Sequence, residues 1–337
     1  MEVRCAHPVA VNEPSQSGEA RRQALRLAQN LGFDEMQAGR VALLATELAT
    51  NLVKHTSDGG ELLLRPLLED AAVGVELLAL DAGPGIANVA QALRDGYSSA
   101  GSAGTGLGAL ARMADFFELY SLPQAGTAVL ARVFARAPDP LPGAALEVGV
   151  VHLPKPGEEV CGDGCALERR DGLTRILMVD GLGHGPGAHE AAGVATRGFL
   201  AAPLPLEAML QRLHGALRPT RGAALALVEV DPAAGTLRFA GVGNLSGSVV
   251  SAATGSRSLI SHNGTVGHQA LRVQQFSYAW PADALLVLHT DGLSNRWNLE
   301  RYPGLAGRHP SLIAGVLYRD FGRNRDDVTV LVARNRV

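Results

Sequence analysis

The chain has 337 residues, of which 47% are hydrophobic and 19% are charged, and its formal net charge is −3. This composition is typical of packed globular domains and excludes an extensively disordered chain. The length favours two domains, and the near-neutral charge gives no strongly basic surface for nucleic acid or an anionic membrane.

The N-terminal segment, MEVRCAHPVAVNEP, lacks the basic and apolar regions of a signal peptide. Charges or glycines interrupt every apolar run before it reaches membrane-spanning length. Three cysteines are too few for a disulfide framework and suit a reducing compartment. We therefore expect a cytoplasmic protein with neither a nucleic-acid nor a membrane partner.

Helices precede strands in the first half of the chain. Residues 20–31 carry alanine and leucine at helical spacing, and a second helix is predicted from Asp34, a good N-cap, to about Thr56. Strand-like runs follow at ELLLRPLL, VGVELLALD, FFELYSL and GTAVLARVFA. This order favours a two-layer α/β sandwich.

The second predicted helix carries a row of three polar residues. Glu47, Asn51 and His55 recur at every fourth position, so they share one helix face. Such a row is also typical of a solvated helix surface, and His55 alone suits the cationic end of a helix. The row therefore gains meaning only from the motifs that follow it.

Two glycine-rich segments follow in order. DAGPGI ends a strand with Asp81, and GSAGTGLGALARMAD opens a helix near Gly108. Glycines let backbone N–H groups approach phosphate oxygens, and a helix N-terminus adds a positive dipole end. A G-x-G-x-G pattern alone also occurs in flexible turns, and here it does not follow the βα unit of a Rossmann fold.

The polar helix, D-x-G-x-G and G-T-G-x-G in that order resemble the GHKL ATPase superfamily, in particular the bacterial anti-sigma-factor and switch serine kinases of the SpoIIAB, RsbW and RsbT type. The resemblance covers residues 18–136 and implies the Bergerat α/β sandwich. It implies that Asp81 binds the adenine of ATP, that Asn51 holds Mg²⁺, and that Glu47 is the general base toward a serine or threonine hydroxyl. The residues implied to contact the nucleotide are Asn51, Asp81, Gly83, Gly85, Gly104, Thr105, Gly106, Leu107 and Gly108, with residues 88–103 as a lid.

A proline-rich segment, ARAPDPLPGAA, separates the two halves. Its closely spaced prolines exclude a helix interior or a central strand. We therefore predict a linker at residues 137–145 between domains at residues 1–136 and 146–337, both of ordinary domain size.

The second half is rich in short strands, with helices predicted near residues 187–201 and 206–217. The strand-like runs are EVGVVHL, TRILMVD, AALALVEVD, TLRFAGVG, SGSVVSA, DALLVLHTD and DVTVLVAR. Strands at this spacing with paired helices favour two packed sheets covered by helices. The whole chain is therefore expected to be a two-domain α+β protein.

Acidic residues stand at the ends of these strands. Asp163 lies in EEVCGDGCAL, Asp180 in MVDGLGHG, Asp291 in LLVLHTDGLSN, and Asp326 with Asp327 in NRDDVTVLVAR. Converging carboxylates repel unless cations neutralise them, and all-oxygen ligands suit Mg²⁺ or Mn²⁺. Each Asp-Gly pair alone is equally typical of a turn.

Two cysteines and one histidine of this half each allow more than one interpretation. Cys161 and Cys165 have zinc-like spacing, but no convincing second pair accompanies them. His184 suits either a proton donor or a surface histidine in a turn of small residues.

The acidic motifs, together with AGVGNLSGSV, resemble the metal-dependent protein phosphatases of type 2C, specifically the bacterial SpoIIE, RsbU and RsbX branch. The resemblance covers residues 147–334 and implies an α-β-β-α sandwich with two metal ions. It implies that Asp180 bridges both ions, that the Gly181 carbonyl binds one of them, and that Asp163, Asp291 and Asp326 complete the other shell. Water activated by these ions would attack a phosphoserine or phosphothreonine.

Kinase-like and phosphatase motifs in one chain predict opposing activities. In the resembled families, a small STAS-domain antagonist is phosphorylated and dephosphorylated in partner switching. We therefore expect a bifunctional regulator of such an antagonist, and hence of a sigma factor or a similar output. Two alternatives stay open: the first domain only sequesters a partner, or it binds ATP to regulate the phosphatase.

Overall fold

The computed structural model describes residues 1–69, 72–94, 106–138, 146–268 and 273–336. The chain divides into two compact units. The N-terminal unit comprises residues 6–139 and 298–319, and the C-terminal unit comprises residues 1–5, 140–297 and 320–337. Two short segments therefore lie outside the units expected from the sequence: residues 1–5 belong to the C-terminal unit and residues 298–319 to the N-terminal unit. Residues 139–145 of the predicted linker lie outside the described residues.

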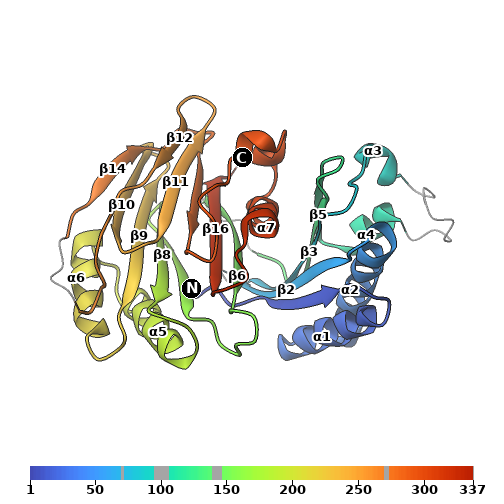
Figure 1. Ribbon diagram of the computed structural model, residues 1–337, viewed down its shortest axis with the longest axis horizontal. Coiled ribbons are helices and arrows are strands. Elements are labelled where there is room, and N and C mark those ends of the chain that lie inside the picture. Colours follow the sequence, from blue (N-terminus) through green and yellow to red (C-terminus); the bar gives the residue numbers. More distant parts are fainter. Residues whose placement is uncertain (70–71, 95–105, 139–145, 269–272, 337) are drawn as a thin grey trace. The chain divides into compact units, whose positions relative to one another are not determined.

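The N-terminal unit is built on one antiparallel sheet (Figure 1). Its strands lie in the order β1 (His7–Val11), β2 (Gly60–Glu69), β3 (Ala72–Asp81), β5 (Thr127–Arg136) and β4 (Phe116–Ser121). The helices are α1 (Gln16–Asn30), α2 (Glu35–His55), α3 (Val89–Ala92) and α4 (Leu107–Met113). Asp34 caps α2 through a capping box with Gln37, which confirms the predicted helix start.

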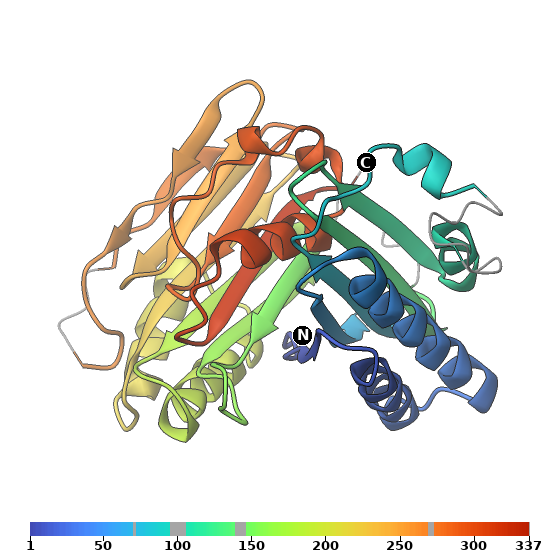
Figure 2. The same cartoon turned by 45° about the vertical axis from the view of Figure 1, so that its right-hand side comes forward.

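The two faces of this sheet pack against different helices. Val75, Leu77 and Ala79 of β3 share a buried apolar core with α1, α2 and α4. The opposite face meets α7 (Pro310–Phe321), where a Cβ atom added to Gly315 would lie 2.8 Å from the side chain of Leu78. Figure 2 shows α7 beside these strands, on the side away from α1 and α2.

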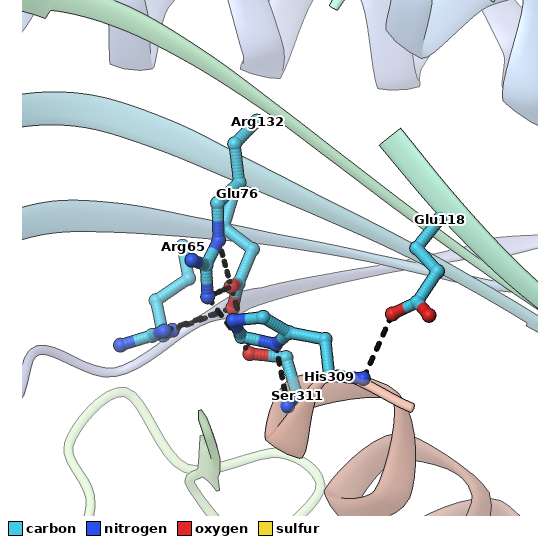
Figure 3. Close-up of polar contacts among 6 residues, drawn as sticks. All are labelled: Arg65, Glu76, Glu118, Arg132, His309 and Ser311. Carbon is cyan, nitrogen blue, oxygen red and sulfur yellow. Dashed lines mark hydrogen bonds and ion pairs between the residues drawn. The ribbon is translucent and has the colours of Figure 1, made fainter. Parts of the chain in front are cut away.

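A buried ionic cluster joins α7 to this face (Figure 3). Glu76 accepts two hydrogen bonds from Arg65, at 2.9 and 3.0 Å, and two from Arg132, at 2.7 and 2.9 Å. The Ser311 hydroxyl donates to the same carboxylate at 2.9 Å. Burial opposes ionisation of Glu76, but the two guanidinium groups outweigh it and lower its pKa to about 2.

The C-terminal unit contains two packed sheets. One has the order β13 (Ser261–His262), β10 (Thr236–Val242), β9 (Ala223–Asp231), β8 (Leu173–Gly181) and β7 (Asp163–Arg170), with β14 (Phe276–Ala279) paired to β10. The other has the order β12 (Gly255–Ser258), β11 (Ser246–Ser251), β15 (Leu285–His289), β16 (Val328–Asn335) and β6 (Leu146–Leu153).

Alternating side chains of each strand divide the apolar residues of this unit between two cores. Ile176 and Met178 of β8 pack with Leu286 and Leu288 of β15 between the sheets. Leu177 of β8 faces the other way, into a core shared with α5 (Pro186–Leu200) and α6 (Leu206–Leu217). The predicted α+β class, with two packed sheets and these two helices, is confirmed.

Two chain segments lie in the unit that their sequence position does not suggest. Residues 1–5 run beside β7, where Glu2 bridges Ala166 and the Val3 N–H donates to the Cys165 carbonyl at 2.9 Å. Residues 298–319 carry two 3-10 turns, Leu299–Arg301 and Leu305–Gly307, and most of α7 into the N-terminal unit. Within the described ranges, no helix combines the length and apolar character needed to cross a membrane.

Candidate functional site

The strand-end carboxylates of the C-terminal unit form one cluster. Antiparallel pairing places Asp163, the first residue of β7, opposite Asp180 near the end of β8. Asp291 follows β15, and Asp326 with Asp327 precedes β16. The charges of the other four carboxylates all act on Asp180. The structure thus brings the sequence-predicted acidic residues of both sheets together.

The carboxylates of this cluster repel one another. Burial and then the neighbouring carboxylates raise the pKa of Asp180 to about 8. Burial also raises the pKa of Asp163, to about 7, although hydrogen bonds to its carboxylate oppose the shift. The pKa values of Asp291 and Asp327 are raised as well, first by burial. Protons or bound cations would both relieve this repulsion.

Neutral side chains orient the carboxylates. The hydroxyls of Thr290 and Thr329 each donate to Asp163 Oδ2 at 2.8 Å. The Asn244 amide donates to Asp291 Oδ2 at 2.8 Å. None of these three residues was predicted to belong to the site, although they stand in the motifs HTDGL, DDVTV and AGVGNL.

Two glycines beside the carboxylates allow close packing that a side chain would prevent. A Cβ atom on Gly162 would lie 2.6 Å from Asp327 Oδ2, and one on Gly181 would lie 2.3 Å from the Ala188 carbonyl oxygen. Asp327 Oδ2 is buried and has no hydrogen-bond partner in the described part of the chain. The unpartnered oxygen and the all-carboxylate donor set fit Mg²⁺ or Mn²⁺. Asp327 was not among the predicted ligands.

The histidines and cysteines near this cluster have other partners. His184 Nδ1 lies 2.7 Å from Glu158 Oε1, and this pair is partly exposed. Cys161 and Cys165 point to different surroundings, since Cys165 packs between the sheets. Cys161 instead lies beside His152, with its Sγ 3.8 Å from the ring Nδ1.

The N-terminal unit contains a cavity of about 470 Å³ beside α2. Its lining includes Glu47, Asn51 and His55 of the predicted polar face, so α2 does turn these three residues to one space. Other sequence-predicted residues that line the cavity are Asp81, Gly85, Gly106 and Leu107. Gly108 is buried in the first turn of α4. Gly104, Thr105 and residues 95–103 of the predicted lid lie outside the described residues.

Asp81 is fixed at one edge of this cavity. Its Oδ1 accepts hydrogen bonds from the backbone N–H groups of Gly83 at 2.8 Å and Thr127 at 3.2 Å. Burial raises its pKa, and these two bonds oppose the rise. Gly126 has φ of +80°, and a Cβ atom there would lie 2.0 Å from the Asp81 carbonyl oxygen, so only glycine fits. Thr127 also lines the cavity and was not predicted from the sequence.

These two sites and their folds define the class of protein: a kinase-like ATPase domain combined with a PP2C-like phosphatase domain. Residues 10–133 match the family model described as the histidine kinase-like ATPase domain, and residues 170–336 match that of stage II sporulation protein E. The chain therefore belongs to the histidine kinase-like ATPase family in its N-terminal part and to the stage II sporulation protein E family in its C-terminal part.

Individual relatives cover each part. The serine/threonine-protein kinase RsbT of Bacillus subtilis (strain 168) is 30% identical over 112 residues, which are 33% of this chain and 84% of RsbT. The phosphoserine phosphatase RsbX of the same organism is 23% identical over 147 residues, 43% of this chain and 73% of RsbX. A solved structure from work on the bacterial stressosome is 30% identical with a TM-score of 0.53, and covers 56% of this chain and 100% of its own.

Proposed function

We propose that the C-terminal unit is a metal-dependent phosphatase that removes phosphate from a serine or threonine of another protein. The observation that carries this proposal is the cluster of carboxylates around Asp180, whose pKa is raised to about 8. The similarity to the phosphoserine phosphatase RsbX supports the same reaction class.

Asp180, Asp291, Asp326, Asp163 and the Gly181 carbonyl are the proposed ligands of two Mg²⁺ or Mn²⁺ ions. Two such ions lower the pKa of bound water and offset charge on the phosphoryl oxygens. Protons held by the carboxyls of Asp180 and Asp163 at neutral pH must leave as cations bind.

The residues around the ligands set their orientation. Thr290 and Thr329 occupy Oδ2 of Asp163 and leave Oδ1 for a cation. Asn244 holds Oδ2 of Asp291 in the same way. Because these donors are uncharged, they fix the carboxylates without neutralising them, and the attraction for cations is kept.

The test is phosphate release from a phosphorylated STAS-domain protein in the presence of Mn²⁺. Asp291→Asn should lower the rate of phosphate release by more than about 100-fold. This substitution removes a metal ligand itself, whereas loss of a residue that only hydrogen-bonds to a ligand costs less. Asp171→Asn is the matched control: this exposed aspartate lies between β7 and β8 with φ of +53°, a conformation that asparagine tolerates. Wild-type rates in Asp291→Asn would refute the metal assignment.

The proposal for the N-terminal unit is that it phosphorylates the same kind of partner with ATP. Asp81 binds adenine, Asn51 holds Mg²⁺ against the phosphates, and Glu47 accepts the proton of the attacking hydroxyl. The lining of one cavity by all three residues supports this proposal, as does the similarity to the kinase RsbT. The chain is then a partner-switching regulator that sets the phosphorylation state of a STAS-domain antagonist, and through it a sigma factor or a similar output.

Transfer of labelled γ-phosphate from ATP to a STAS-domain protein tests the kinase assignment. Glu47→Gln should abolish transfer while ATP still binds, because the substitution removes a base and keeps the shape of the side chain. Glu35→Gln, in the first turn of the same helix, is the control. Transfer that survives Glu47→Gln would contradict the base assignment. Binding of ATP by the wild type without any transfer would favour a sequestering domain.

One observation favours the alternative of a nucleotide-sensing phosphatase. Residues 298–319 belong to the N-terminal unit, yet they stand in the chain between the proposed ligands Asp291 and Asp326. Arg319 of this segment donates to the backbone carbonyl of Asp81 at 2.8 Å. Phosphatase rates should then change when a non-hydrolysable ATP analogue is added, and the change should vanish in Asp81→Asn. Equal rates with and without the analogue would exclude this alternative.

A further inference from the structure

Three metal-binding side chains converge in the C-terminal unit, beside the strand-end carboxylates of the proposed phosphatase site. Cys5, His152 and Cys161 each offer one ligand atom, and these atoms all lie within 4.8 Å of one another. His152 and Cys161 are each only 3% exposed, whereas Cys5 is partly exposed. A compact group of two thiols and one imidazole is thus nearly enclosed by the fold.

Three separate parts of the chain supply this group. Pairing of residues 1–5 with β7 delivers Cys5, and His152 stands on β6 opposite Thr329 of β16. Cys161 lies two residues before Asp163 in the segment that leads into β7. Because the ligands are far apart in sequence, no spacing motif reveals them. The C-x3-C spacing of Cys161 and Cys165 points to the wrong pair.

We propose that Cys5, His152 and Cys161 form a zinc site. Thiolate and imidazole are the donors that zinc prefers, in contrast to the all-oxygen cluster at the strand ends. Neighbouring ligand atoms of a tetrahedral zinc site lie about 3.5–3.8 Å apart. Cys161 Sγ and His152 Nδ1 are already 3.8 Å apart, and all three ligand atoms lie within 4.8 Å of one another, so binding requires a closure of about 1 Å at most. The partly exposed side at Cys5 leaves the fourth position to water.

Zinc at this site ties the N-terminal segment to the support of the carboxylate cluster. His152 Nδ1 lies 2.8 Å from Thr329 Oγ1, and that hydroxyl donates to Asp163 Oδ2 at 2.8 Å. A ring nitrogen that binds zinc has no proton to donate, so zinc at Nδ1 would replace the contact with Thr329. Because Cys161 lies two residues before Asp163, the site still acts as a positioning element for the loop that carries Asp163. Both thiols release their protons when zinc binds, and no oxidation or reduction takes place.

The test measures metal binding directly and needs no phosphatase activity. Full-length protein, stripped of metal and kept reduced with a phosphine, is equilibrated with excess Mg²⁺ and given one equivalent of Zn²⁺. We expect one zinc per chain after gel filtration, and a thiolate-to-cobalt charge-transfer band when Co²⁺ replaces Zn²⁺. Cys5→Ser should lose both signals, whereas Cys165→Ser, which alters a cysteine outside the group, should keep them.

Further variants separate this site from the carboxylate cluster and from misfolding. Asp180→Asn should keep its zinc; loss of zinc there would place the metal among the carboxylates and overturn the proposal. Because Cys5 is partly exposed, Cys5→Ser should keep the wild-type circular dichroism spectrum and lose only the rise in Tm caused by Zn²⁺. Three results would each overturn the proposal. The first is zinc retained in Cys5→Ser, and the second is a cobalt spectrum without a thiolate band. The third is a reduced wild-type chain that binds no zinc and instead forms a Cys5–Cys161 disulfide on oxidation.

Discussion

Two buried carboxylates of this chain have opposite electrostatic surroundings. Glu76, on the α7-covered face of the N-terminal sheet, meets two guanidinium groups that lower its pKa to about 2. Asp180, at the end of β8, meets four other carboxylates, and its pKa is raised to about 8. The first acid is neutralised by arginines of the fold itself, whereas the second has only like charges around it and is the centre of the proposed metal site. The comparison separates an ionic cluster that the fold completes from one that retains repelling charges.

The largest expected effect is the loss of stability when Glu76, the acid neutralised by two arginines, is replaced. Glu76→Gln removes the carboxylate charge that Arg65 and Arg132 both bind, and the side chains of these arginines are only 5% and 16% exposed. We expect a loss of about 3–5 kcal/mol in the free energy of unfolding, measured by urea denaturation at neutral pH.

Glu229 provides a matched control in the C-terminal unit. It is also buried and binds two arginines, Arg175 at 2.7 Å and Arg238 at 3.0 Å. The side chain of Arg238 is 44% exposed, so water can solvate it when its partner is removed. Glu229→Gln should therefore cost less than Glu76→Gln. An equal loss would mean that burial of the arginines does not decide the penalty.

The next expected effect is a loss of Mn²⁺ affinity when Thr290, an uncharged donor to Asp163, is replaced. Thr290→Val removes one of the two hydroxyls on Asp163 Oδ2 and keeps the shape of the side chain. We expect Mn²⁺ affinity to fall by about 10–100-fold, measured from the Mn²⁺ dependence of phosphate release. Ser248→Ala, a partly buried hydroxyl of β11 outside the cluster, should leave the Mn²⁺ dependence unchanged. A shift in the control as large as in Thr290→Val would contradict the assigned role of Thr290.

Local sequence patterns were enough to predict some parts of both sites. The four-residue spacing of Glu47, Asn51 and His55 fixes them on one face of α2 whatever the rest of the fold does. Asp180 and Asp291 each end an apolar run, so their place at a strand end also follows from the local sequence. These predictions required only the period of one helix or the length of one strand.

Other parts depend on long-range packing, which a local pattern does not contain. Thr127 reaches the cavity because β5 pairs with β3, and Cys5 meets Cys161 because residues 1–5 run beside β7. Ser311 reaches Glu76 from more than two hundred residues away in the chain. The proline-rich segment predicts one boundary between two domains. Composition alone does not show that residues 1–5 belong to the C-terminal unit and residues 298–319 to the N-terminal unit.

The last expected effect is the pH dependence of the ion-free protein, and it tests the raised pKa of Asp180. The folded pKa of about 8 exceeds the usual value of 3.8, so between these pH values the folded chain holds a proton that the unfolded chain has released. Stability should therefore decline as pH rises from about 6 to 8, whereas Glu76 is ionised in both states over this range and contributes no slope.

Asp180→Asn should flatten the decline and raise the Tm of the ion-free protein at pH 8, because it removes a carboxylate from the repelling group. Mg²⁺ should raise the Tm of the wild type more at pH 8 than at pH 6, since fewer protons must leave as the ion binds. Differential scanning fluorimetry across pH, with and without Mg²⁺, measures both effects. If Asp180→Asn keeps the wild-type slope, the carboxylates around Asp180 are not the source of the pH dependence, and the contrast with Glu76 loses its physical basis.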